Sequence, residues 1–221
     1  MSYKYKSYHS SIKYYQSGFL KRKSNFFYFS LYIINFAFLI FLFSGCATSK
    51  KVSENVSAYP ADYPLTENIA YSSSTDLTVK IPQGWSTAED QQCKCIDLWL
   101  IRNDFSATLN LVTYEVSDTI RKKTIEGKLD TLLSYSKQEK KSKLKEDFKQ
   151  AGDDEYFNIN GRPFAAYEYI GDEGLPIRVV VFQYQGRIFE LSAMPAKDVG
   201  GGKVDIEELF KVQQSVLSSV K

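Results

Sequence analysis

The chain has 221 residues, with 28 Lys and Arg, 26 Asp and Glu, and a formal net charge of +2. Residues 1–45 hold six of the basic residues and no acidic ones, so the rest of the chain carries 22 basic and 26 acidic groups. Such a mildly acidic domain is a poor candidate for binding nucleic acid, whose phosphates require a basic surface. The only histidine, His9, also lies in the N-terminal part. Catalysis by Ser-His or Cys-His pairs and metal binding by histidine are therefore excluded for the remainder.

Residues 1–45 have the pattern of a targeting segment. A basic cluster at residues 21–23 precedes an uncharged apolar run at residues 26–43, and Ser44 and Gly45 follow directly before Cys46. A basic region, an apolar run and small residues at a processing point are typical of a secretory signal. Because a cysteine comes next, this end resembles a bacterial lipoprotein signal, in which cleavage before the cysteine leaves its thiol to carry acyl chains such as palmitate. We therefore expect lipid attachment at Cys46, although Phe43 stands where such signals usually have leucine.

The alternative for this segment is an uncleaved membrane helix. The apolar run is at the short end of the roughly 20 residues that span a bilayer. Both interpretations place the following residues outside the cytoplasm, since the basic cluster stays on the inner side. Ala47 after the cysteine resembles the choice of outer-membrane lipoproteins in Gram-negative sorting, so we expect a lipid-anchored protein of the cell envelope at the outer membrane, facing the periplasm.

Three parts follow from these patterns: a signal peptide at 1–45, a flexible tether at 46–74 and one folded domain at 75–221. The tether is rich in Ser, Thr, Asn and Lys and contains Pro60 and Pro64, which favours an extended and poorly ordered segment. Docking of Tyr59, Tyr63 and Tyr71 onto the domain is the less favoured alternative.

Period-two alternation and turn residues predict a series of strands in the domain. We expect strands at residues 77–81, 96–101, 107–116, 156–159, 163–170, 177–184 and 188–194, with residues 86–94 as a polar loop. Apolar residues then recur at helical spacing from Ile125 to Leu133, which predicts an amphipathic helix that starts between Ser117 and Thr124 and ends near Lys141. A last helix begins after Asp205, which can cap its first turn.

Two local signals define the sheet. Asn160-Gly161 tolerates positive φ at both positions and predicts a tight hairpin turn. Val179 and Val181 lie on one face of their strand while Val180 and Phe182 lie on the other, so this strand is expected to be buried on both sides. Strands joined by hairpins, with helices between and after them, predict an α+β domain in which an antiparallel sheet of about six or seven strands is flanked by helices.

This pattern resembles the PsbP/Mog1-like fold, including bacterial lipoproteins built on it. The residues that carry the resemblance are Ile81-Pro82-Gln83-Gly84-Trp85, Asn160-Gly161-Arg162-Pro163 before a strand with Tyr167, and a final helix with Phe210 and Val216. Each of these residues has a packing or turn role, so the resemblance implies no catalytic residue and no cofactor. Plant members assist the oxygen-evolving complex of photosystem II, but a fold alone does not transfer a function.

The expected function is a membrane-anchored, non-enzymatic binding or assembly factor whose partners are the membrane, through its lipid, and another envelope protein. An enzyme that uses carboxylates is an alternative, because Asp97, Glu168 and Glu190 fall within predicted strands. Outward-facing strand carboxylates are far commoner than catalytic pairs.

A second alternative rests on Cys93 and Cys95, which could support thiol redox chemistry or metal binding. Two thiols at this spacing are a weak metal signal, because zinc sites show two such pairs or added histidines. In an extended strand the pair is too far apart for a disulfide, which would require a turn. We favour two free thiols at the start of a strand over a disulfide, and a disulfide over a metal site.

Overall fold

A computed structural model describes residues 57–89, 95–125, 128–171, 174–196 and 204–221. The strands are β1 (Leu65–Tyr71), β2 (Thr78–Pro82), β3 (Trp85–Ala88), β4 (Leu98–Arg102), β5 (Ala107–Tyr114), β6 (Lys149–Ile159), β7 (Arg162–Ile170), β8 (Pro176–Tyr184) and β9 (Arg187–Pro195). The helices are α2 (Asp118–Ile125), α3 (Leu129–Leu144), the short 3-10 helix η1 (Lys145–Asp147) and α4 (Ile206–Ser218). This part of the chain is therefore α+β, as the sequence predicts.

Seven of the strands form one antiparallel sheet in the order β3-β4-β5-β9-β8-β7-β6, and β1 pairs with β2 in a separate two-stranded sheet. The turn between β6 and β7 confirms the predicted hairpin: Asn160 has φ of 52° and Gly161 of 77°. Strands that are consecutive in sequence lie beside one another in this sheet, except that β5 pairs with β9 rather than with β6, from which α2 and α3 separate it.

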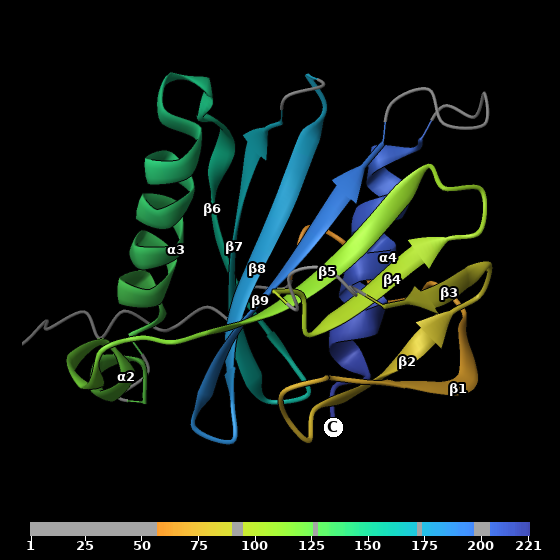
Figure 1. Ribbon diagram of the computed structural model, residues 1–221, viewed down its shortest axis with the longest axis horizontal. Helices are drawn as coiled ribbons and strands as arrows, with labels where there is room; N and C mark the ends of the chain where they lie inside the picture. The colour runs from red at the N-terminus through yellow and green to blue at the C-terminus, as the bar shows by residue number, and fades with distance from the viewer. Residues whose placement is uncertain (1–56, 90–94, 126–127, 172–173, 197–203) are drawn as a thin grey trace, which may run out of the picture. The chain divides into compact units, whose positions relative to one another are not determined.

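Helices cover both faces of the seven-stranded sheet (Figure 1). Helix α3 packs on β7 and β8, whereas α4 packs on β9 and on β2. The predicted alternation in β8 is confirmed, because Val179 and Val181 belong to the apolar cluster with α3 while Val180 and Phe182 belong to the cluster with α4. The sheet thus separates two apolar cores.

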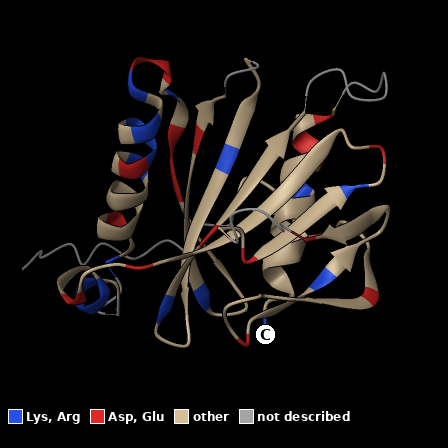
Figure 2. Ribbon diagram, viewed as in Figure 1, with Lys and Arg blue, Asp and Glu red and all other residues tan. Residues whose placement is uncertain are grey.

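Helix α4 begins as the sequence predicts. The Asp205 carboxylate accepts hydrogen bonds from the backbone N–H groups of Glu207 and Glu208, at 3.0 and 3.2 Å. These bonds satisfy donors that have no partner within the helix. Phe210 and Val216 of its inner stripe are buried in the core. Helix α3 carries charged residues of both signs (Figure 2).

The expectation of a flexible tether through residue 74 is wrong for residues 57–74. Residues 65–71 form β1, which pairs with β2. Before it, Tyr59 and Tyr63 pack against the core that contains α4. The docking of Tyr59 and Tyr63 is thus the alternative that the structure supports, and the packed part of the chain includes residues from Ser57 onward.

Three further elements differ from expectation. Residues 86–88, expected as loop, belong to β3, which pairs with β4. The strand expected at 156–159 begins already at Lys149, and the predicted long helix is divided into α2 and α3. Residues 1–56, with the predicted signal, His9 and Cys46, lie outside the described residues, as does Cys93. In the part of the chain that the structure describes, no helix has the length and apolarity needed to cross a membrane.

Candidate functional site

An open cleft of about 890 Å³ lies where β3 ends and β4 begins. The C-terminal half of β1, the end of β3 and the segment leading into β4 line it. Ser73, just after β1, donates its backbone N–H to the Asp97 carbonyl at 2.7 Å and thereby ties the β1 side to the start of β4. The Asp97 carboxylate in turn accepts the backbone N–H of Thr113 on β5. Asp97 therefore stabilises the local structure rather than projecting as a free carboxylate.

Apolar side chains form part of the lining of this cleft. Ile69 and Tyr71 are two residues apart on β1, and 49% and 70% of their surfaces are exposed. Trp99 of β4 also lines the cleft, and its indole Nε1 is buried without a hydrogen-bond partner among the described residues. Exposed aromatic residues beside a concavity are typical of protein interfaces, where Tyr and Trp are enriched.

Cys95 lies directly before Ile96, which lines the cleft. It is exposed and disulfide-bonded. The preference for two free thiols is thus wrong for Cys95, because the chain before β4 is not an extended strand: β4 begins only at Leu98. The other cysteines of the chain, Cys46 and Cys93, lie outside the described residues.

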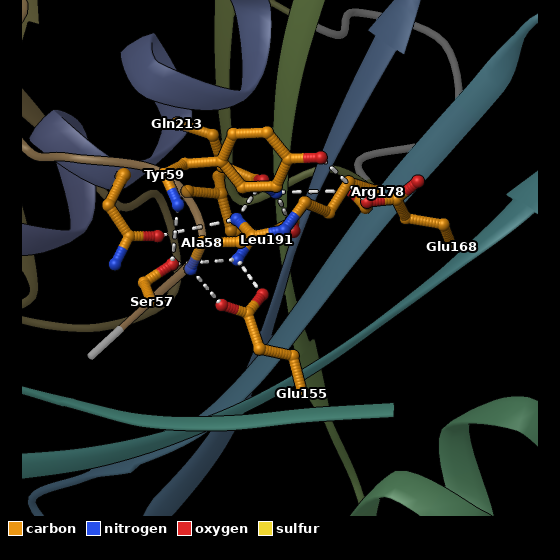
Figure 3. Close-up of polar contacts among 9 residues, drawn as sticks. Ser57, Ala58, Tyr59, Glu155, Glu168, Arg178, Leu191 and Gln213 are labelled. Atoms are coloured by element: carbon orange, nitrogen blue, oxygen red, sulfur yellow. Dashed lines mark hydrogen bonds and ion pairs between the residues drawn. The ribbon is translucent and has the colours of Figure 1, made fainter. Parts of the chain in front are cut away.

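A cluster around Arg178 holds residues 57–59, the start of the described chain, against the sheet (Figure 3). Arg178 of β8 is 0% exposed. Its guanidinium pairs with the Glu155 carboxylate at 2.6 Å and donates to the side-chain carbonyls of Gln213 and Gln214 at 2.9 and 3.3 Å. Glu155 also accepts the backbone N–H of Ala58 at 2.6 Å. Glu155 thus neutralises the buried charge of Arg178 and at the same time binds the backbone of Ala58.

The Tyr59 ring packs over the Arg178 guanidinium. Its ring centre lies 4.9 Å from the Arg178 guanidinium carbon and 5.2 Å from the ring centre of Phe210 on α4. Its hydroxyl donates to the Glu168 carboxylate at 3.2 Å. Burial, reinforced by the Glu168 charge, raises the pKa of Tyr59 to about 12. Burial also raises the pKa of Glu168. It would raise that of Glu155 too, but the adjacent Arg178 outweighs it and lowers the pKa of Glu155.

A second polar cluster lies on the opposite face of the sheet, beneath α3. Glu190 of β9 is 1% exposed. It pairs with the Lys140 ammonium at 2.6 Å and accepts hydroxyl hydrogen bonds from Ser136 at 2.8 Å, from Ser192 at 3.0 Å and from Tyr114. Burial opposes the ionised form, but Lys140 and these hydroxyls outweigh it and lower the pKa of Glu190. The cluster joins α3 to the sheet through an ionised, fully hydrogen-bonded carboxylate.

The three carboxylates of the enzyme alternative do not come together. Glu190 faces α3, whereas Glu168 faces Tyr59 on the side of α4, and Asp97 bonds to β5 beside the cleft. A carboxylate pair for general acid–base catalysis needs both groups in reach of one substrate, and a sheet separates Glu168 from Glu190. Within the described ranges, no three His, Cys, Asp or Glu side chains are grouped to hold a metal ion.

Sequence reasoning missed Arg178, Lys140 and Tyr59 as members of these clusters. The sequence contains a signal for the first: Arg178 is the only charged residue in the apolar run of residues 177–182. A charge in a strand buried on both sides must be paired, which predicts a buried ionic cluster. Lys140 carried no such signal, because it lies within a lysine-rich surface helix.

Comparisons with known proteins bear on the fold. No protein-family model and no curated protein matches the chain. Among solved structures, the solution structure of cyanobacterial PsbP (CyanoP) from Synechocystis sp. PCC 6803 superposes with a TM-score of 0.51 at 14% sequence identity, covering 70% of this chain and 91% of that one. A crystal structure from Bacteroides thetaiotaomicron VPI-5482 matches with a TM-score of 0.30 at 12% identity, covering 66% of this chain and 44% of that one. With its seven-stranded antiparallel sheet and helices on both faces, the chain has a PsbP-like α+β fold.

Proposed function

We propose that this protein is a lipid-anchored, non-enzymatic binding or assembly factor of the cell envelope, and that it binds another envelope protein through the cleft between β1 and β4. The observation that carries the binding role is the exposure of Ile69 and Tyr71 beside the cleft. Leaving these two side chains in water is unfavourable, and a partner surface that covers them gains the free energy of apolar burial. A PsbP-like fold fits such a role.

The polar clusters support binding over catalysis. The carboxylates of Glu155 and Glu190 each pair with a buried or partly buried cation, which leaves them ionised and held in place. A general acid or base needs an accessible group poised to exchange its proton. These two carboxylates instead fix Ser57, Ala58 and α3 to the sheet, so they maintain the shape of the domain.

The anchor is tested by metabolic labelling. Cells that express the full chain are grown with radiolabelled palmitate, alongside cells that express Cys46→Ser. We expect label on the unsubstituted chain and none on the variant, and we expect the labelled protein in the outer-membrane fraction. Label that persists on Cys46→Ser contradicts lipid attachment at this residue.

The cleft is tested by photo-crosslinking in intact cells. A benzoylphenylalanine residue replaces Tyr71 in one strain and Gln185, in the turn between β8 and β9, in a control strain. We expect irradiation to join the first to a discrete envelope protein and the second to none. Absence of an adduct from position 71 contradicts binding through the cleft.

A thiol-dependent function is the second candidate, and the disulfide bond of Cys95 favours it. Exposed disulfides in an oxidising envelope can be reduced by exchange with another thiol. Because Cys95 precedes a residue that lines the cleft, reduction is expected to change partner binding there. The adduct from position 71 is compared before and after treatment of cells with dithiothreitol; an unchanged yield excludes control of the cleft by this disulfide.

A further inference from the structure

The turn between β4 and β5 exposes a single aromatic side chain. Phe105 is 62% exposed, and its backbone φ is 62°. This is the left-handed region, which Gly enters freely and Asn tolerates but which a bulky residue adopts only under strain. Two unfavourable features therefore coincide at one residue: an apolar ring in water and a strained backbone.

Neighbouring groups hold this turn in its conformation. The Asp104 carboxylate accepts hydrogen bonds from the backbone N–H and the hydroxyl of Ser106, at 3.0 and 2.6 Å. Asn103 donates its backbone N–H to the Gly84 carbonyl at 2.9 Å, and Ala196 donates to the Ser106 carbonyl at 2.7 Å. Phe105 itself contributes only its backbone N–H, which donates to the Arg102 carbonyl at 2.8 Å.

The Phe105 ring has no packing role within the described part of the chain. It belongs to neither apolar core cluster and to none of the aromatic contacts among these residues. A glycine at position 105 would preserve every hydrogen bond of the turn and would relieve the backbone strain. The fold thus has no need of a phenylalanine here, and strained residues on rigid supports are characteristic of functional sites.

We propose that Phe105 is an anchor residue that enters an apolar pocket of the envelope protein bound by this chain. The inference rests on the proposed binding function and adds a second contact, at the opposite end of β4 from the cleft. A protein pocket fits better than a lipid bilayer, because Arg102 and Asp104 form an ion pair at 3.4 Å beside the ring. A pocket can enclose the ring alone, whereas insertion into a bilayer would also draw this pair out of water.

The test uses a matched pair of glycine substitutions in the full chain. Gln185 also has positive φ, 48°, at a tight turn between strands. Phe105→Gly and Gln185→Gly are therefore both expected to relieve strain and to raise the melting temperature, by about 2–4 °C each. Only Phe105→Gly removes an apolar anchor.

Binding is read from the crosslink at position 71, described above, in each background. We expect Phe105→Gly to lower the yield of the adduct at least tenfold, as loss of an aromatic anchor does, while Gln185→Gly leaves it unchanged. Benzoylphenylalanine placed at position 105 should join the same protein as at position 71. An unchanged yield in Phe105→Gly, or a crosslink from position 105 to phospholipid, overturns the role of Phe105 and leaves the cleft proposal standing. No adduct from position 71 in the unsubstituted chain overturns both.

Discussion

Replacing Lys140 by Met tests whether the ion pair beneath α3 holds the domain together. The substitution preserves most of the side-chain volume but removes the one cation that pairs with Glu190 among the described residues; the Glu190 side chain is 2% exposed. Breaking a buried pair from one side costs about 3–5 kcal/mol, because it leaves an uncompensated charge. We expect the lower end, about 3 kcal/mol, since three hydroxyls still donate to the carboxylate and since Lys140 is itself 23% exposed.

The pH dependence of stability should change sign with this substitution. In the unsubstituted chain the pKa of Glu190 is lowered, so its contribution to stability is present above the unfolded pKa and is lost as pH falls through the folded pKa. In Lys140→Met, burial still favours the protonated carboxyl, but the nearby positive charge that opposes this effect is gone. The pKa of Glu190 should therefore rise above its value in the unfolded chain. The variant should then recover stability as pH falls from 7.5 towards 5, where the unsubstituted chain gains none from this group.

The measurement is urea denaturation of residues 52–221, which form one compact unit, at pH 7.5 and at pH 5. Lys143→Met is the matched control: Lys143 lies on the same helix and pairs with Glu139 at 3.7 Å, both of them solvent-exposed. Such a pair contributes less than about 1 kcal/mol. Equal unfolding free energies for the two variants at pH 7.5, or a difference between them that does not shrink at pH 5, would refute the role assigned to Glu190.

Three further predictions concern other parts of the domain. Tyr59→Ala should lower the unfolding free energy by about 2 kcal/mol, since a partly buried aromatic ring is removed, and should speed proteolysis before β1; unchanged values would show that the segment is not docked. Gly161→Val should cost about 2 kcal/mol, because φ there is 77°, whereas Asn158→Val at an exposed position of β6 should be close to neutral; equal melting temperatures would contradict the turn geometry. Cys95 should resist alkylation until a reductant is added, as peptide mass spectrometry can show, and ready alkylation of the native chain would contradict its disulfide bond.

Much of the sheet is predictable from sequence because period and turn chemistry agree there. The hairpin at Asn160-Gly161 and the doubly buried strand β8 are each defined by residues within about ten positions. Local signals of this kind need no knowledge of distant contacts. The cap of Asp205 belongs to the same class.

Strand β1 escaped prediction for a physical reason. Its pairing with β2 shifts register between Leu65 and Ile69, so the alternation of apolar and polar residues is interrupted within seven residues. The segment directly before β1 also depends on partners distant in sequence: the hydroxyl of Ser215 on α4 accepts the Tyr63 N–H at 2.9 Å. Composition favoured a tether, but a segment rich in proline and serine can equally well dock on a domain. Composition therefore could not distinguish the two states.

The two buried polar clusters depend on long-range geometry as well. Lys140 and Glu190 are 50 positions apart, and the packing of α3 on the sheet brings them together. In sequence, Lys140 is one lysine among several and Glu190 is an ordinary strand carboxylate. The cleft could not be predicted for the same reason, because its lining comes from three separate strands, β1, β3 and β4.

Docking of residues 57–63 sets the reach of the domain from a membrane. With the lipid on Cys46, as proposed, only residues 46–56 separate the anchor from the packed segment. Eleven residues span at most about 40 Å when fully extended, whereas a tether through residue 74 would span about 100 Å. With such an anchor, the buried pair of Arg178 and Glu155, which holds residues 57 and 58 on the domain, would shorten the linker by 18 residues and would restrict the domain to partners closer to the bilayer.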